Sequence, residues 1–380
     1  MADKSIKSLI VAVFSLFLLG LSGSAFAKDE HENKEGRKNS AFDANEVIFD
    51  HVLDAYQFHF LSYKGADDEE HHVSIPLPVI LYSPQRGFDV FSSSNFHHGH
   101  EIYKGYKEDG NKIHAVTPDG TIDESVKFYD LSLTRNVVQM MLALILLVVI
   151  MLGVAAKYKK GIGTKQAPTG FQNAIEPVIT FIRDEVAKPN LGHKYEKYLP
   201  YLLTLFFFIL INNVIGLVPG TANVTGNIAF TVVLGVVSFI VITISGNKHY
   251  WGHIVNPPVP FGIKFIMVPV EILGIFTKPF ALIIRLFANM LAGHIIIICL
   301  VSLIFIFGGL NKGIGWGFSP VSIAFAVFIY LIEVLVAFIQ AFIFTNLTAV
   351  FIGQAIEETH HEEAHHEAGG IAQYDDAVIV

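Results

Sequence analysis

The segment KPFALIIRLFANMLAGHIIIICL (278–300) is an apolar run with one arginine, Arg285, near its centre. Arginine stays protonated in proteins, and a charge at the middle of a bilayer costs a few kcal/mol or more. Such a side chain is tolerated where it meets water or a counter-charge, and by default it marks an ion path. A structural ion pair between helices is the alternative. Both readings require a membrane protein.

The composition places the whole chain in that class. Of the 380 residues, 52% are hydrophobic and 16% charged, whereas a soluble domain carries about 25% charged residues. Several apolar runs exceed the roughly 18 residues that mark a spanning helix, and no alternating barrel-strand pattern occurs. We therefore expect an all-α polytopic membrane protein. The single cysteine, Cys299, cannot form an internal disulfide.

Residues 1–27 have the layout of a cleaved secretory signal. Lys4 and Lys7 precede an apolar core, and Ala25-Phe26-Ala27 precedes charged residues. An uncleaved first span is the alternative. Cleavage would leave the mature N-terminus outside the cytoplasm.

Residues 28–136 are hydrophilic, with 20 acidic residues against 11 lysines and arginines. The middle of this segment, VSIPLPVILYSPQRGFDVF, is rich in proline and β-formers, so we expect a small, partly β segment outside the membrane. Several histidines here are potential metal ligands, but such pairs are more often solvated, and no metal site is predicted. They are His71, His72, His97, His98 and His100.

The first span of the mature chain is predicted at 137–156, with a cytoplasmic linker at 157–197. The linker holds eight lysines and arginines against four acids, and positive charge flanks the cytoplasmic end of a span. Within it, 171–192 repeats apolar residues at helical spacing but is too charged to span, which predicts a helix along the cytoplasmic surface. The apolar positions are Phe171, Ile175, Ile179 and Ile182.

A transmembrane hairpin is expected at 198–244 and two long channel helices at 265–352. The runs 265–308 and 318–352 would extend roughly 66 and 52 Å as helices, against about 30 Å of hydrocarbon. Each must be broken or steeply tilted, and Pro269 and Pro279 allow the first to bend. This gives five spans and a cytoplasmic C-terminus. The acidic, histidine-rich tail 353–380 is read as disordered rather than metal-binding.

Five side chains in the last two runs titrate or stay charged: Glu271, Lys278, Arg285, His294 and Glu333. At 100° per residue, Glu271 and Asn289 both fall within about 40° of Arg285, whereas His294 falls on roughly the opposite side. The spacing predicts an arginine-centred polar stripe with a separate polar position leading from it.

Further polar residues extend this arrangement. Glu333 and Gln340 share a face of the next helix, and Asn212 and Asn213 lie in the hairpin. Histidine and glutamate exchange protons when their neighbours tune them, but Arg285 cannot release its proton and blocks a continuous proton wire. Protons would then cross only if a partner carried them around the arginine. That partner should be an acid that is neutral in lipid and ionised beside Arg285.

The motif RLFANMLAGH (285–294), together with QAFIF (340–344), resembles subunit a of rotary F-type ATP synthases. The resemblance covers about 137–357, including the surface helix and the ILINNVIGLVPG hairpin. It implies a stator beside a rotating ring of c subunits, a b-type peripheral stalk, other synthase subunits and a bacterial inner membrane.

The resemblance also assigns roles to residues. Arg285 would face the ring carboxylate, with two offset half-channels on either side. His294 and Glu333 would line the outer half-channel, with Asn289 and Gln340 nearby, and Glu271 would lie near the cytoplasmic exit. Asn212 and Asn213 are secondary lining candidates. The resemblance says nothing about 28–136.

The function predicted is proton transport coupled to ATP synthesis by a non-catalytic subunit, without a cofactor or nucleic acid. No GxxxxGK[ST] phosphate loop occurs, so nucleotide chemistry would lie in other subunits. A self-contained cation/proton antiporter is the alternative, although we find neither inverted repeats nor interrupted helices. A histidine-based metalloprotein is disfavoured because the histidines lie mainly outside the apolar runs. Sodium remains an alternative coupling ion.

Overall fold

The computed structural model describes residues 54–64, 70–97, 101–109, 112–117, 119–123, 125–161, 163, 170–218, 220–257 and 259–357. In this part of the chain, five helical segments are long and apolar enough to cross a bilayer, which agrees with the five predicted spans. They are Arg135–Lys159, Phe171–Gly216, Ile228–Ser245, Gly262–Leu310 and Gly313–Ile356. The predicted signal 1–27 and most of the tail 353–380 lie outside the described residues.

The segment before the first span contains antiparallel strands, which confirms the expectation of a partly β region. They form a β1–β2 pair, a sheet in the order β4-β3-β7, and a β5–β6 pair. The strands are β1 (Gln57–Lys64), β2 (Glu70–Pro76), β3 (Pro78–Ser83), β4 (Gly87–Ser92), β5 (Tyr106–Asp109), β6 (Lys112–Ala115) and β7 (Tyr129–Asp130), with a 3-10 turn η1 (Ser93–Phe96). Alternate residues of β3, Val79 and Leu81, are fully buried against Phe96 and Tyr106. We call this region the β domain.

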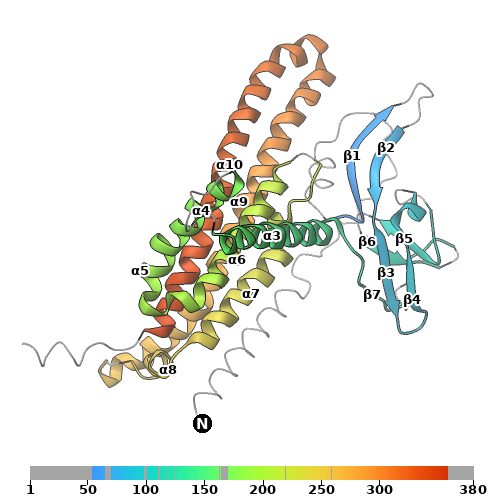
Figure 1. Ribbon diagram of the computed structural model, residues 1–380. Coiled ribbons are helices and arrows are strands. Elements are labelled where there is room, and N and C mark those ends of the chain that lie inside the picture. The colour runs from blue at the N-terminus through green and yellow to red at the C-terminus, as the bar shows by residue number, and fades with distance from the viewer. Residues whose placement is uncertain are drawn as a thin grey trace, which may run out of the picture.

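Hydrogen bonds join the β domain to the first membrane helix, α3 (Arg135–Lys159). The backbone N–H of Arg135 donates to the carbonyl of Ala55 (2.9 Å), and that of Asn136 donates to Asp54 Oδ1 (3.1 Å). These bonds satisfy donors that a helix start otherwise leaves unpaired. The strands accordingly gather at one end of α3 (Figure 1).

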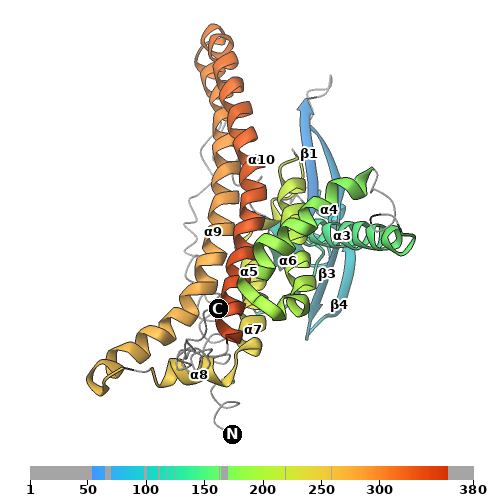
Figure 2. The same ribbon diagram turned by 60° about the vertical axis from the view of Figure 1, so that its left-hand side comes forward.

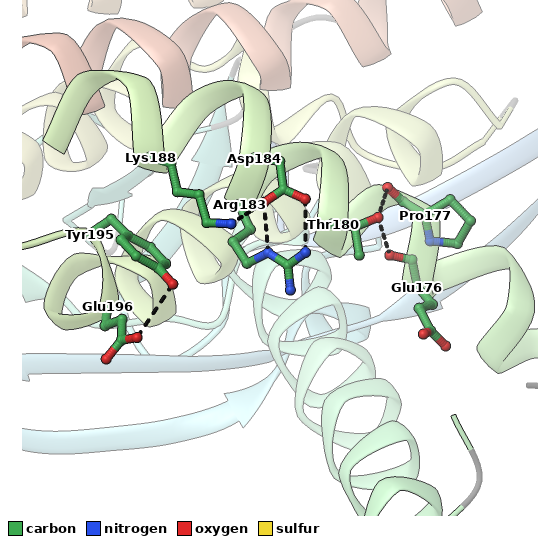
Figure 3. Close-up of polar contacts among 8 residues, drawn as sticks. All are labelled: Glu176, Pro177, Thr180, Arg183, Asp184, Lys188, Tyr195 and Glu196. Atoms are coloured by element: carbon green, nitrogen blue, oxygen red, sulfur yellow. Dashed lines mark hydrogen bonds and ion pairs between the residues drawn. The ribbon is translucent and has the colours of Figure 1, made fainter. Parts of the chain in front are cut away.

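A broken helical segment follows α3 and replaces the single helix predicted at 171–192. It consists of α4 (Phe171–Phe181), the π-helical η2 (Ile182–Ala187), α5 (Lys188–Leu191) and the 3-10 turn η3 (Gly192–Lys194). Ile182, Val186 and Ala187 are fully buried, so the segment is amphipathic as predicted. Asp184, by contrast, is partly exposed and pairs with Arg183 (2.8 Å) and Lys188 (2.7 Å), as Figure 3 shows.

The next two helices form the predicted hairpin, α6 (Tyr195–Gly216) and α7 (Ile228–Ser245), joined through the 3-10 turn η4 (Val224–Gly226). The connection is tied to other helices by side chains. Gln139 of α3 donates to the carbonyl of Ala222 (2.5 Å) and accepts from its N–H (2.7 Å). Asn223 donates to the carbonyl of Met290 (3.1 Å).

After α8 (Lys248–Val255), the chain forms two long antiparallel helices, α9 (Phe261–Leu310) and α10 (Lys312–Ile356). Both exceed the predicted bounds because the glycine-rich segment between 308 and 318 is helical except at Asn311. A Cβ on Gly315 would lie 2.6 Å from the Cα of Gly308, so glycine permits the two helices to pack closely at this end. Pro269 and Pro279 lie inside α9, which stays continuous, and its N-terminal part bends away from α10 (Figure 2).

Candidate functional site

Arg285 lies on the face of α9 that the rest of the chain leaves open. Leu282, Leu286 and Met290, at four-residue spacing, are at most 1% exposed and form the packed face of the helix. Arg285 lies on the exposed side. Among the described residues it has no hydrogen-bond or ion-pair partner. The ion-pair alternative raised by the sequence is therefore not formed with any described acid.

His294 and Glu333 meet across α9 and α10, although 39 positions separate them in sequence. His294 Nδ1 lies 3.4 Å from Glu333 Oε1, and the side chains are 20% and 4% exposed. The second carboxylate oxygen of Glu333 is buried with no partner among the described residues. Gly293 makes room for this carboxylate, because a Cβ at that position would collide with Glu333 Oε1. We call these two residues the buried pair.

A second polar contact between the same helices lies nearer Arg285. Asn289 Nδ2 donates to Gln340 Oε1 (3.2 Å), and Gln340 is 2% exposed. The structure thus agrees with the predicted placement of Asn289 and His294 on different sides of α9. Asn289 is exposed on the arginine side, whereas His294 turns toward α10.

Asn212 and Asn213 are fully buried in α6, beside α10. Asn213 Nδ2 donates to the carbonyl of Ala337, one turn from Glu333, at 3.1 Å. Asn212 Nδ2 donates to Phe208 O within its own helix (2.8 Å). Both side-chain carbonyls lack partners among the described residues. The amide of Asn213 therefore bonds to α10, whereas that of Asn212 bonds within α6.

Glu271 does not join this group and lies 14 residues before Arg285 on α9, near α8. Its Oε1 lies 3.9 Å from Nδ1 of His253, and the two side chains are 37% and 47% exposed. Lys278, between Glu271 and Arg285, donates to Gln354 Oε1 of α10 (2.7 Å). The predicted residues thus fall into a polar group between α6, α9 and α10, an arginine without a partner among the described residues, and a separate, partly exposed acid.

Sequence reasoning missed four polar residues that the structure brings toward the site. Gln139 gave a signal in the sequence as a lone amide in an apolar run. Its partner, Ala222, lies in a loop 83 positions away and could not be identified from the sequence. Asn223 and Thr225 lie in the hairpin connection, where polar residues are common and carry no signal. His253 lies in a loop sequence, and only its approach to Glu271 distinguishes it.

Chemically, this arrangement offers titratable groups on both sides of a fixed positive charge. The buried pair places an imidazole beside a carboxylate, two groups that can each take up or release a proton, whereas a guanidinium stays charged. No phosphate-binding or nucleophilic constellation accompanies these groups in the part of the chain that the structure describes.

Residues 137–353 match the family described as ATP synthase A chain. The chain belongs to the ATP synthase subunit a family. Over 246 residues it is 51% identical to ATP synthase subunit a of Chloroherpeton thalassium, covering 63% of this chain and 72% of that protein. Over 259 residues it is 48% identical to ATP synthase subunit a 2 of Chlorobaculum tepidum, covering 66% and 71%.

A more distant relative, ATP synthase subunit a of Myxococcus xanthus, is 42% identical over 243 residues, which are 62% of this chain and 77% of that protein. Membership in the subunit a family confirms the resemblance drawn from the arginine motif and favours proton transport over a self-contained antiporter. Residues 47–131, which include the β domain strands, match a family described as Domain of unknown function (DUF8433).

Proposed function

We propose that this subunit a is the non-catalytic, proton-translocating stator of an F-type ATP synthase. It contacts a rotating ring of c subunits along α9 and α10 and leads protons to and from that ring through two half-channels. The observation that carries the proposal is Arg285, exposed at the middle of a long apolar helix and without a partner among the described residues.

The environment of Arg285 favours a partner on another chain. A guanidinium facing lipid is expensive, so its counter-charge must come from outside the described chain. Ala281, Ala288 and Ala292 lie on the same exposed side of α9 as Arg285. Small residues let helix backbones approach closely in membranes. A ring helix with one carboxylate would supply the counter-charge of Arg285 and would pack closely against the alanine-lined face of α9.

Buried acceptors favour a hydrated route on the outer side of Arg285. Asn212 Oδ1, Asn213 Oδ1 and Glu333 Oε2 are buried without partners among the described residues, and Thr225 Oγ1 is a fourth such atom. Buried polar atoms in proteins are nearly always hydrogen-bonded, and ordered water supplies the missing partner. Water between these groups would connect the outer surface to the buried pair.

The mechanism follows from the order of these groups along α9. A proton from the outer side reaches the buried pair and then the ring carboxylate, which becomes neutral and leaves Arg285 for lipid. After the ring turns, the carboxylate releases its proton toward Glu271 and the cytoplasm, and it returns ionised to Arg285. The fixed charge of Arg285 repels protons and prevents a direct leak between the two routes.

Orientation and location follow from charge and belong to the same proposal. Lys157 and Lys159 lie in the last turn of α3 and Lys160 follows it, so this end faces the cytoplasm and the β domain lies outside. We assign the protein to the bacterial inner membrane, with the mature N-terminus outside, the C-terminus inside and the segment 171–194 along the cytoplasmic surface. The two long helices would lie slanted in the bilayer, with a b-type stalk holding the stator.

ATP-driven acidification of inverted membrane vesicles tests the proposal. In Arg285→Ala, pumping should fall to background while the ATPase stays bound, and passive proton leak should equal or exceed that of the unmodified complex. Arg183→Ala, which removes an arginine already paired with Asp184, is the matched control and should pump normally. Normal pumping by Arg285→Ala would refute the assignment of the arginine to the ring contact.

A further inference from the structure

A second histidine–glutamate contact lies at the opposite end of the proposed path from the buried pair. His253 of α8 approaches Glu271 of α9, with 3.9 Å between Nδ1 and Oε1. Both side chains are substantially exposed, at 47% and 37%. We call these residues the exposed pair. Glu271 belongs to the N-terminal part of α9, which bends away from α10 (Figure 2).

We propose that His253 exchanges protons between the cytoplasmic solution and Glu271, and so acts as the proton-collecting residue at the cytoplasmic mouth. This inference rests on the proposed function. The segment carrying His253 lies between Lys248 and Lys264 and contains no acid, which places it on the cytoplasmic side. Histidine is the side chain that changes charge between about pH 5 and 8, the range in which the cytoplasm supplies protons.

A rate argument explains why such a residue is useful. Even at a diffusional limit of about 10¹⁰ M⁻¹ s⁻¹, one group meets only roughly 100 free protons per second at pH 8. Enzymes commonly turn over about 1–1,000 times per second, and each ATP moves several protons. The encounter rate with free protons is therefore barely sufficient for turnover, and protonated buffer molecules must deliver the other protons. An exposed imidazole accepts them from buffer more readily than a half-buried carboxylate does.

The proton transfer balances without another reactant. A buffer acid gives its proton to neutral His253, and the imidazolium then gives one proton to the Glu271 carboxylate and returns to neutral. Rotation of either exposed side chain, or one bridging water, closes the 3.9 Å separation. In ATP synthesis the same steps run in reverse.

The surrounding charged groups leave His253 as the titrating partner of Glu271. Burial, followed by the Glu271 charge, raises the pKa of the Tyr250 hydroxyl, so this group stays neutral. Lys264 donates to Asn256 Oδ1 (2.6 Å) and Lys278 donates to Gln354 Oε1 (2.7 Å). The remaining charged or titratable side chains of α8 are exposed and have no acidic partner among the described residues. They are Lys248 and His249.

The test compares His253→Ala with His249→Ala, a change one helical turn away at a histidine without an acidic partner among the described residues. In inverted vesicles the cytoplasmic face is outside, so the medium supplies the protons. At about pH 8 in dilute, membrane-impermeant HEPES, His253→Ala should pump about three- to tenfold more slowly than the unmodified complex. Concentrated HEPES should restore its rate, and His249→Ala should match the unmodified complex throughout.

Two results would overturn the inference. One is a His253→Ala rate equal to that of His249→Ala in dilute buffer. The other is a slow rate that concentrated buffer leaves unchanged, since that indicates structural damage rather than lost proton exchange. His253→Gln, which keeps a polar side chain but cannot take up a proton, should repeat the buffer dependence. Arg285→Ala in the same vesicles tests the proposed function by itself. A failure of the proposed function can therefore be distinguished from a failure of the role proposed for His253.

Discussion

The two histidine–glutamate contacts on either side of Arg285 have similar chemistry in opposite environments. The buried pair is 20% and 4% exposed at 3.4 Å, whereas the exposed pair is 47% and 37% exposed at 3.9 Å. A buried proton relay has no substitute, because bulk buffer cannot reach it. An exposed one competes with every buffer molecule in solution. The buried pair should therefore control whether protons pass, and the exposed pair how fast they arrive.

The largest effect expected in testing this comparison comes from removing one member of the buried pair. Glu333→Leu or His294→Leu should each lower ATP-driven pumping by about tenfold or more at any buffer concentration, with less leak than Arg285→Ala. The exchanged variant His294→Glu/Glu333→His retains both groups and should pump faster than either single variant. Equal rates for the exchanged and single variants would mean that the pair has no joint role.

A smaller effect is expected from crowding the buried pair without changing it. Gly293→Ala places a Cβ against the Glu333 carboxylate, and overpacking of this kind costs ~1–3 kcal/mol. Pumping should fall several-fold with the complex assembled. Gly274→Ala is the control on the same helix, since nothing lies within 4 Å of a Cβ there. A normal rate for Gly293→Ala would show that the Glu333 side chain relocates freely.

The smallest effect on transport is expected from the β domain, remote from both pairs. Tyr56 donates to Asp130 Oδ2 (2.5 Å), and burial, with this bond, raises the pKa of the Tyr56 hydroxyl above its ordinary value of 10.0. A raised folded-state pKa contributes stability that is full below about pH 10 and is lost as the pH rises through the folded value. The protection of the β3 and β7 amides, measured against their base-catalysed intrinsic exchange rates, should therefore fall above pH 10.

Tyr56→Phe separates this titration from other alkaline effects. The variant should show lower amide protection at neutral pH and a smaller loss of protection above pH 10, while proton pumping at neutral pH stays normal. An unchanged pH profile of protection would exclude Tyr56 as the titrating group.

Hydrophobic periodicity and charge predicted the membrane part of the fold well, because lipid permits few alternatives. The five spans, the amphipathic character of 171–192 and the partly β segment all appear in the structure. Helices α9 and α10 extend further toward each other than the apolar runs 265–308 and 318–352. The close approach of Gly315 to Gly308, and capping of the Gly313 N–H by Asn311 Oδ1 (2.8 Å), make this segment helical instead.

The site was predictable in its residues but only partly in its contacts. A 3.6-residue period places Arg285 and His294 on different sides of one helix, and the structure agrees. The partners that His294 and Glu271 contact on α10 and α8 depend on the register and bending of separate helices, which the sequence period does not give. His253 carried no signal of its own, because a histidine in a polar loop is ordinarily solvated.

The amides that hold the hairpin connection also matter mechanically. A stator beside a turning ring experiences a sideways drag with every step. Asn223 donates a hydrogen bond to the carbonyl of Met290 in α9. The side-chain amide of Gln139 bonds to both the N–H and the carbonyl of the neighbouring Ala222. In the proposed complex these bonds would pass drag on α9 to α3 and, through the bonds at Ala55 and Asp54, to the β domain. In the proposed complex the β domain would act as a brace for α9, and torque on the ring would strain it.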